Sequence, residues 1–264
     1  MEEDIEKEDL NEYPEDIDDE DLDEDDTIQG YVRRLANTES IPLSPIDINI
    51  VSTVQIETPN LEWVNFDVQP RKMKITNSGH TGNNPCLNKN VCKINPTKND
   101  LKYRVYNARH IVVLIYSKFL VLVSAKWEGE RPYIAGGPLR DNYVFSQLHF
   151  HWGTNDMEGS EHTTDGMKHP AELHVVTYKS CYSTQEAALK HVDGIVILVY
   201  FIRLKGGDHP LLWKILDILP EIQIANTSFK IKPFPLEDII TPFNDDYFGY
   251  WGSVITTEYS HFVL

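Results

Sequence analysis

The chain has no long apolar run and few cysteines, and both shortages restrict the class of protein. Its N-terminus, MEEDIEKEDL, lacks the basic start and the apolar run of roughly 7 to 15 residues that form a secretory signal. The longest apolar stretch, residues 111–123, contains Ser117 and Lys118 and is shorter than the roughly 20 residues of a membrane helix. We therefore expect no membrane span and a cytoplasmic location. Three cysteines in 264 residues are too few for a disulfide scaffold.

Basic residues are scarce at the N-terminus. Residues 1–26 contain 17 acidic residues and one lysine, a net charge of −16, and the remaining 238 residues carry a net charge of −1. Such a segment cannot bury enough apolar surface to fold, so we predict that residues 1–30 are a disordered acidic segment. Its role is either to keep the chain soluble or to bind basic partners. No run of Lys and Arg is present in the rest of the chain, so we expect no nucleic-acid partner.

Residues 31–264 have the pattern of one domain that is mainly β. Short segments alternate apolar and polar residues, as half-buried strands do, and Gly, Pro, Asn and Asp separate them. One helix is predicted at 209–219, where Pro210 suits the first helical position. The predicted strands cover residues 44–56, 72–76, 121–125, 146–152, 172–178 and 195–204.

Histidines at alternate positions give the strongest functional signal. In the stretch FSQLHFHWG, residues 145–153, strand geometry places His149 and His151 on one face. The stretch AELHVV places His174 on a second strand, and the residues between the two stretches are enough to reverse the chain. Three imidazoles would then meet at one point, with the open coordination typical of catalytic zinc.

Two further polar residues support the prediction of a three-histidine metal site. Gln147 and Glu172 each precede a histidine by two residues on the same strand face, so each is placed to accept a hydrogen bond from the ring nitrogen that does not bind metal. A lone His-x-His pair more often has an ordinary structural or surface role. The combined pattern Q-x-H-x-H plus E-x-H instead predicts a shared Zn²⁺ site.

Seven stretches of the chain, taken in order, match the pattern of one enzyme family: SPIDI (44–48), KITNSGHT (74–81), IAGGPL (134–139), FSQLHFHWG (145–153), GSEHTTDG (159–166), PAELHVV (170–176) and DGIVIL (193–198). On these stretches the chain resembles the α-class carbonic anhydrases. The resemblance implies a large twisted, mostly antiparallel sheet with short surface helices, a Zn²⁺ cofactor, and reversible hydration of carbon dioxide to bicarbonate and a proton.

The resemblance also implies roles for individual residues. His149, His151 and His174 correspond to the zinc ligands, with Gln147 and Glu172 as their outer acceptors. His80 corresponds to the histidine that carries the released proton to solvent, a step that suits its ordinary pKa near neutrality. Glu161 corresponds to the glutamate that orients a threonine hydroxyl at the active site. Val176 and Ile197 fall where the family lines its apolar CO2 pocket, although core packing explains both equally well.

Two departures from the family pattern bear on activity. Residues 82–120 read as an insertion, because joining residue 81 to residue 121 restores the family's continuity. In the stretch YWGSVITTE, Ile255 occupies the position of the orienting threonine, and Thr256 takes that role only if the register shifts by one residue. We also expect the family's final strands to be missing after residue 264. Translated introns would explain both departures; a transcript that keeps every codon of 82–120 and stops after Leu264 would contradict this hypothesis.

Two functions of the histidine site therefore stay open at the level of sequence, beside a third hypothesis in which the chain is an acidic interaction protein whose function lies in residues 1–26. The first is a zinc-dependent carbonic anhydrase. The alternative is a catalytically impaired relative that binds zinc or a protein partner, which Ile255 favours and the retention of all three histidines opposes.

Overall fold

The structure is a computed structural model that describes residues 44–78, 103–104, 113–114, 121–153, 155–203, 209–243, 246–253 and 260–264. The predicted acidic segment 1–30 and nearly all of the predicted insertion 82–120 lie outside these residues. In the described part of the chain, no helix is both long and apolar enough to cross a membrane.

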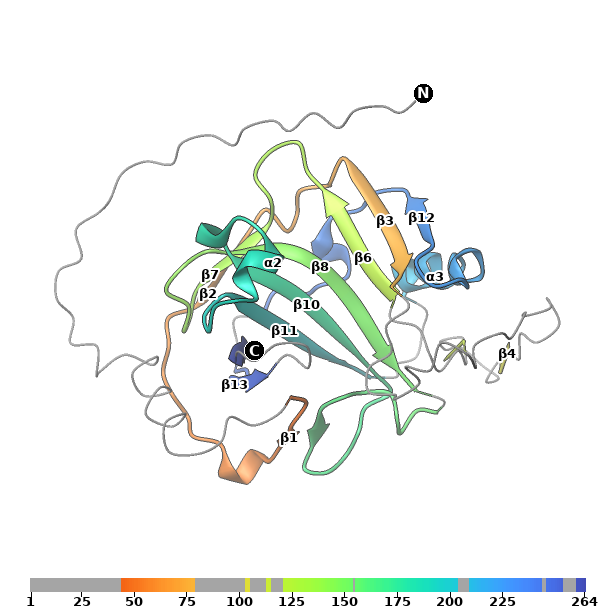
Figure 1. The fold of residues 1–264 in the computed structure, drawn as a ribbon. Coiled ribbons are helices and arrows are strands. Elements are labelled where there is room, and N and C mark those ends of the chain that lie inside the picture. Colours follow the sequence, from red (N-terminus) through yellow and green to blue (C-terminus); the bar gives the residue numbers. More distant parts are fainter. Residues whose placement is uncertain are drawn as a thin grey trace. The chain divides into compact units, whose positions relative to one another are not determined.

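The described structure is mostly β, as predicted, and its principal sheet has ten strands (Figure 1). The strands are β1 (Asp47–Ile48), β2 (Leu61–Val64), β3 (Lys72–Asn77), β4 (Tyr103–Arg104), β5 (Val113–Leu114), β6 (Val121–Lys126), β7 (Tyr133–Gly136), β8 (Tyr143–Trp152), β9 (Thr163–Thr164), β10 (Ala171–Lys179), β11 (Ile195–Ile202), β12 (Ser228–Ile231), β13 (Tyr250–Ser253) and β14 (Ser260–Val263).

Helices are short. The α-helices are α2 (Gln185–Ala188) and α3 (Pro210–Leu216), and the 3₁₀ helices are η2 (Ile50–Ser52), η3 (Ser180–Tyr182), η4 (Leu219–Ile222) and η5 (Leu236–Asp238).

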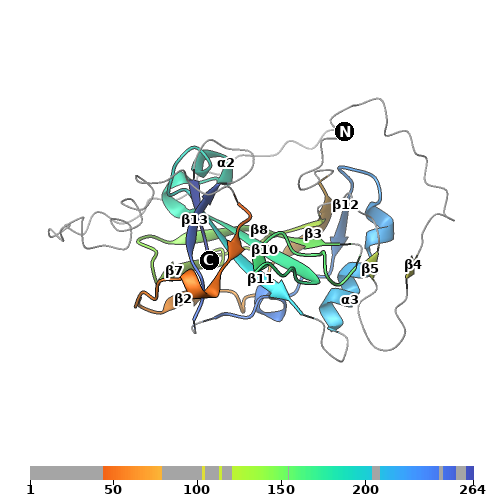
Figure 2. The same ribbon diagram turned by 90° about the horizontal axis from the view of Figure 1, so that it is seen from below.

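The main sheet runs in the order β12-β3-β6-β8-β10-β11-β14-β13, with β7 also paired to β8 and β2 paired to β7. Its pairs are antiparallel except β11 with β14, which is parallel. Two small separate sheets pair β1 with β9 and β4 with β5. The views in Figures 1 and 2 show β8, β10 and β11 side by side as long curved strands. These three strands are the platform of the candidate site.

The two faces of β8 and β10 have different surroundings, which confirms the predicted alternation. Leu148 and Val175 are fully buried in the main hydrophobic core, where α3 and the segment after it supply Ile215, Leu236 and Ile240. The alternate positions of β8 carry the histidines. A smaller cluster, built from Val176, Tyr178, Ala188 and Ile195, packs α2 against the histidine-bearing face. The core therefore fixes the strands from one side and leaves the other side for polar groups.

The predicted strand at 44–56 is wrong for most of its length. Only β1 forms there, and the chain then turns through η2, because the Asn49 side chain accepts a hydrogen bond from the backbone N–H of Ser52 at 3.1 Å. Asparagine side chains compete with strand pairing in this way. As a result Ile50 and Val51 are 51% and 93% exposed rather than half-buried.

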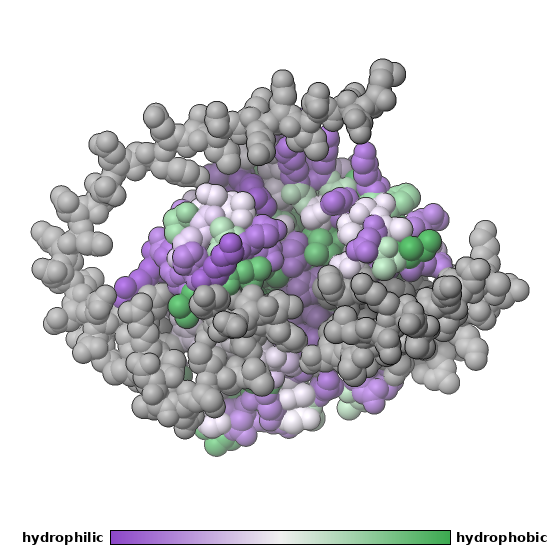
Figure 3. Space-filling model, in the orientation of Figure 1, coloured by the Kyte–Doolittle hydropathy of each residue, from purple (hydrophilic) through white to green (hydrophobic). Residues whose placement is uncertain are grey.

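Lysines from three strands gather on the outer face at one edge of the sheet. Lys74 of β3 lies directly opposite Lys230 of β12, and Lys72 lies opposite Lys126 of β6. All four are exposed, and none is ion-paired with a carboxylate of the described residues. In Figure 3 the upper part of the surface, where Figure 1 draws the adjoining ends of β3 and β6, is largely hydrophilic. The linear sequence does not reveal this lysine face because its members meet only through strand pairing.

Candidate metal centre

Three imidazoles meet on the polar face of β8 and β10. His149 lies directly opposite His174 in the antiparallel pairing, and His151 is two residues further along β8. Each histidine has one ring nitrogen that lies within 4.8 Å of a ring nitrogen of both other histidines. The ring centroids are 4.5 to 5.0 Å apart. The chain reversal predicted between the two stretches therefore brings these three rings together. Together they could hold a metal ion.

Burial keeps two of these rings, those of His149 and His151, neutral. Burial, reinforced by the neighbouring imidazoles of His174 and His151, lowers the pKa of His149 well below its ordinary value of 6.5. Burial and the His174 ring lower the pKa of His151 to about 3. Neutral imidazole is the form that binds a metal, so His149 and His151 are already in the protonation state that a metal site requires.

One ring nitrogen shows that the cluster fits a metal better than it fits simple packing. Nε2 of His151 is buried and has no hydrogen-bond partner among the described residues. An unpaired buried polar atom costs free energy, so such atoms are rare without a functional cause. A zinc ion bound by the three rings would give this nitrogen a partner.

Gln147 occupies the position predicted for an outer partner. Its Oε1 lies 3.0 Å from Nδ1 of His149. Because the amide oxygen can only accept, Nδ1 carries the proton and Nε2 of the same ring is free to bind a metal.

Glu172 is the other predicted outer partner, and it contacts more groups than expected. Its carboxylate, fully buried, hydrogen-bonds Nε2 of His174, lies 2.6 Å from Nδ1 of His162, and accepts from the backbone N–H groups of Glu161 and His162 at 3.1 and 3.0 Å. Burial alone would raise the pKa of Glu172, but the hydrogen bonds from His162 and His174 lower it well below its ordinary range. The carboxylate therefore stays ionised and fixes the His174 ring.

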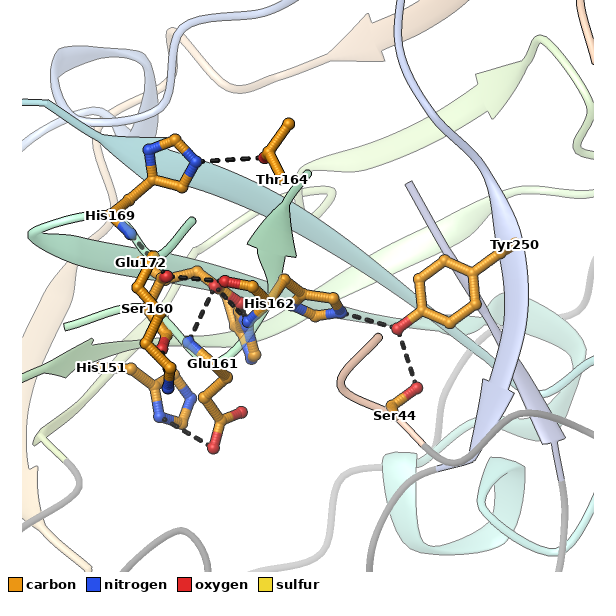
Figure 4. Close-up of polar contacts among 11 residues, drawn as sticks. Ser44, His151, Ser160, Glu161, His162, Thr164, His169, Glu172 and Tyr250 are labelled. Carbon is orange, nitrogen blue, oxygen red and sulfur yellow. Dashed lines mark hydrogen bonds and ion pairs between the residues drawn. The ribbon is translucent and has the colours of Figure 1, made fainter. Parts of the chain in front are cut away.

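A chain of contacts leads from Glu172 through His162 to the hydroxyl groups of Tyr250 and Ser44 (Figure 4). Nε2 of His162 is 2.6 Å from the Tyr250 hydroxyl, which is 2.9 Å from Oγ of Ser44. Sequence reasoning assigned no role to His162, Tyr250 or Ser44. The available signal was the histidine of GSEHTTDG, directly after Glu161. Nothing near Tyr250 pointed to this contact, because it joins residues 88 apart.

Glu161 lies beside the triad. Its Oε1 is 3.5 Å from Nδ1 of His151, and burial raises the pKa of its carboxyl group. The hydroxyl that the resemblance gives it as a partner, on Thr256 or a residue in its place, lies outside the described residues. His80 lies outside them as well, so the structure places neither residue relative to the triad.

Apolar residues adjoin the triad on the neighbouring strand. Val176 of β10 lies opposite Ile197 of β11, and Val199 lies opposite His174. Val176 and Ile197 also belong to the cluster under α2. Both predicted explanations, a lining for an apolar substrate and ordinary packing, are consistent with this position.

Comparison with known proteins agrees with the geometry. Residues 86–264 match the family model described as eukaryotic-type carbonic anhydrase. This range includes part of segment 82–120, and the insertion there stays a prediction.

Three relatives show the extent of the similarity. The chain is 36% identical over 152 residues to carbonic anhydrase 5A, mitochondrial, of Homo sapiens. The aligned region covers 57% of this chain and 49% of that protein. It is 38% identical over 129 residues to carbonic anhydrase 3 of Bos taurus, 48% of each chain. It is 34% identical over 157 residues to carbonic anhydrase 1 of Mus musculus, 58% of each chain. The chain thus spans about half the length of the curated relatives it matches.

Proposed function

The chain belongs to the eukaryotic-type carbonic anhydrase family, and we propose that it binds one zinc ion through His149, His151 and His174 and catalyses the reversible hydration of carbon dioxide to bicarbonate and a proton. The unpaired, buried Nε2 of His151 at the meeting point of three imidazole rings is the observation that carries this proposal. A bound zinc ion would supply activated water for attack on carbon dioxide at neutral pH.

The protein's own residues hold and orient the site. Gln147 and Glu172 fix the tautomers of His149 and His174, so that each ring presents its other nitrogen to the metal. Val176 and Ile197 supply an apolar surface that suits a small uncharged substrate such as carbon dioxide. The released proton then passes to solvent, with His80 as its proposed carrier. Glu161, through Thr256 or a residue in its place, is the proposed orienting group for the nucleophile.

Zinc content and CO2 hydration, measured on the full chain, test the proposal. We expect one zinc per chain and stopped-flow hydration of CO2 that is lost when zinc is removed by a chelator. His149→Ala should lose the metal, whereas His209→Ala, at an exposed histidine of the described structure, should keep it. A full chain that folds but binds no zinc at neutral pH would contradict the proposal.

A second candidate function is that of a relative that binds zinc or a protein partner but is impaired in CO2 hydration. Ile255 stands in the register of the orienting threonine, and an isoleucine side chain cannot accept or donate a hydrogen bond. Stoichiometric zinc without CO2 hydration would favour an impaired relative that binds zinc or a partner. The cytoplasmic location stays a prediction, and the human relative is named as mitochondrial.

A further inference from the structure

Two of the three triad rings have a clear outer partner, and the third faces a carboxylate. Gln147 bonds His149, and Glu172 bonds His174. In the described part of the chain, His151 makes no hydrogen bond through Nδ1, and the Glu161 carboxylate is the one group at ion-pair distance from it, at 3.5 Å. Figure 4 shows the Glu161 side chain extending toward the His151 ring.

The backbone of Glu161 is held in place by Glu172, which is the outer partner of the His174 ring. Its backbone N–H donates to Oε2 of Glu172 at 3.1 Å, and the next residue, His162, donates to the same oxygen. The side chains of His151 and Glu161 are 14% and 21% exposed, so the pair is largely shielded from water. The carboxylate is therefore positioned by the backbone rather than by a flexible surface contact.

We propose that Glu161 is a positioning residue for His151, accepting the Nδ1 proton so that Nε2 of that ring points to the metal; this inference rests on the proposed zinc site. When Nε2 binds a metal, the ring proton must reside on Nδ1, which then faces the carboxylate. The 3.5 Å separation exceeds a normal hydrogen bond, and the contact tightens once this tautomer is fixed. Each ring of the triad then has one acceptor: Gln147, Glu161 and Glu172.

This role differs from the one that the family resemblance implies. There Glu161 acts on a threonine hydroxyl, and here its partner is a ring of the triad. The two carboxylates, Glu161 and Glu172, would also offset the charge of a divalent ion held by three neutral ligands. Glu161 thus acts on metal affinity as well as on any reaction.

The test is the zinc affinity of the full chain, measured by competition with a chromophoric chelator. Glu161→Leu keeps the size of the side chain and removes the acceptor, so we expect a loss of affinity of about 10-fold to 100-fold. Glu161→Gln keeps a neutral acceptor and should recover part of that loss. Glu57→Leu, at an exposed glutamate, is the matched control and should bind zinc like the unsubstituted chain.

A second readout separates positioning from general damage to the fold. In the zinc-loaded chain, ¹⁵N-edited NMR of the histidine rings should show a His151 Nδ1–H that is protected from exchange and shifted downfield. In Glu161→Gln that signal should move upfield while the signals of His149 and His174 keep their positions. Should Glu161→Leu fail to fold, the Gln variant decides, and an unmoved His151 signal overturns the inference.

The outcomes also separate this inference from the proposed function. If the unsubstituted chain binds no zinc, both fail. If it binds zinc and Glu161→Leu binds within twofold as tightly, the zinc site stands and the role of Glu161 is overturned.

Discussion

Glu172 lies directly opposite His151 in the pairing of β10 with β8, yet its carboxylate turns to His162, with Oε1 2.6 Å from Nδ1 of that ring. His162 lies in the loop segment just before β9, ten residues before Glu172. The buried carboxylate therefore ties this loop to β10 and fixes His174 at the same time. Stability of the loop and geometry of the triad depend on one side chain.

Removing this carboxylate should destabilise the protein strongly. Glu172→Ala leaves the His162 ring and two backbone N–H groups buried without an acceptor, and we expect the free energy of unfolding to fall by about 3 kcal/mol. Glu172→Gln should cost less because its amide oxygen still accepts. Urea unfolding measures both, with Glu62→Ala, at an exposed glutamate of β2, as control. A loss below about 1 kcal/mol for Glu172→Ala would show that the contacts of Glu172 contribute little.

The metal-free protein should lose stability as the pH falls below 6.5. His149 and His151 have a pKa below their ordinary 6.5 in the folded state, so in this range the unfolded chain binds protons that the folded chain does not. Each such proton lowers the free energy of unfolding by about 1.4 kcal/mol per pH unit. For His151 the loss continues down to its folded pKa of about 3. Glu172, whose pKa is lowered from 4.5, adds to the loss only below pH 4.5.

Chemical unfolding between pH 6 and pH 5 checks this sign. Among the described residues, His151→Leu removes one of the three rings with a lowered pKa, those of His149, His151 and His169, so the stability of the variant should fall less steeply with decreasing pH. Equal slopes for the variant and the unsubstituted chain would contradict the prediction.

Relieving like charge on the lysine face should stabilise the sheet. Lys74 and Lys230 are directly opposite each other on β3 and β12, an arrangement that costs stability in paired strands. We expect Lys74→Gln to raise the free energy of unfolding by about 0.5 kcal/mol at low ionic strength. The gain should vanish near 1 M salt, where the screening length is about 3 Å. Lys190→Gln, at an exposed lysine outside the sheet, should show neither effect.

The sequence predicts the elements that carry the triad because their signal is local. Alternation along β8 and β10 places His149, His151 and His174 on one face without knowledge of the rest of the fold. Gln147 and Glu172 follow from the same rule, since each is two residues from its histidine. The placement of these side chains on one strand face can be predicted because period-two geometry depends only on the strand itself, and their roles as ligands and outer partners stay predictions.

Contacts between distant segments could not be predicted in this way. The Tyr250 hydroxyl meets His162 only after β13 and the loop before β9 are placed by the fold. The lysine face likewise requires the order of β12, β3 and β6. The strand predicted at 44–56 is wrong because a local hydrogen bond from Ser52 to Asn49 redirects a chain whose apolar spacing alone suggests a strand.

The last prediction concerns Gly159, where the backbone passes close to β10. Its N–H donates to the carbonyl of His169 at 3.0 Å, and a Cβ placed on it would overlap the backbone carbonyl of Pro170. Gly159→Ala must therefore push the segment that carries Glu161 away from β10. We expect the free energy of unfolding to fall by about 2 kcal/mol, as in other overpacked sites.

The same displacement should weaken zinc binding although no ligand is changed. Moving residues 160–162 separates the Glu161 and His162 backbone N–H groups from Glu172 and so loosens the His174 ring. We expect about a 10-fold loss of zinc affinity for Gly159→Ala. Gly129→Ala is the matched control, because nothing lies within 4 Å of its added methyl group, and it should change neither quantity. Loss of stability in Gly159→Ala with unchanged zinc affinity would mean that the triad is held by β8 and β10 alone, without help from the loop.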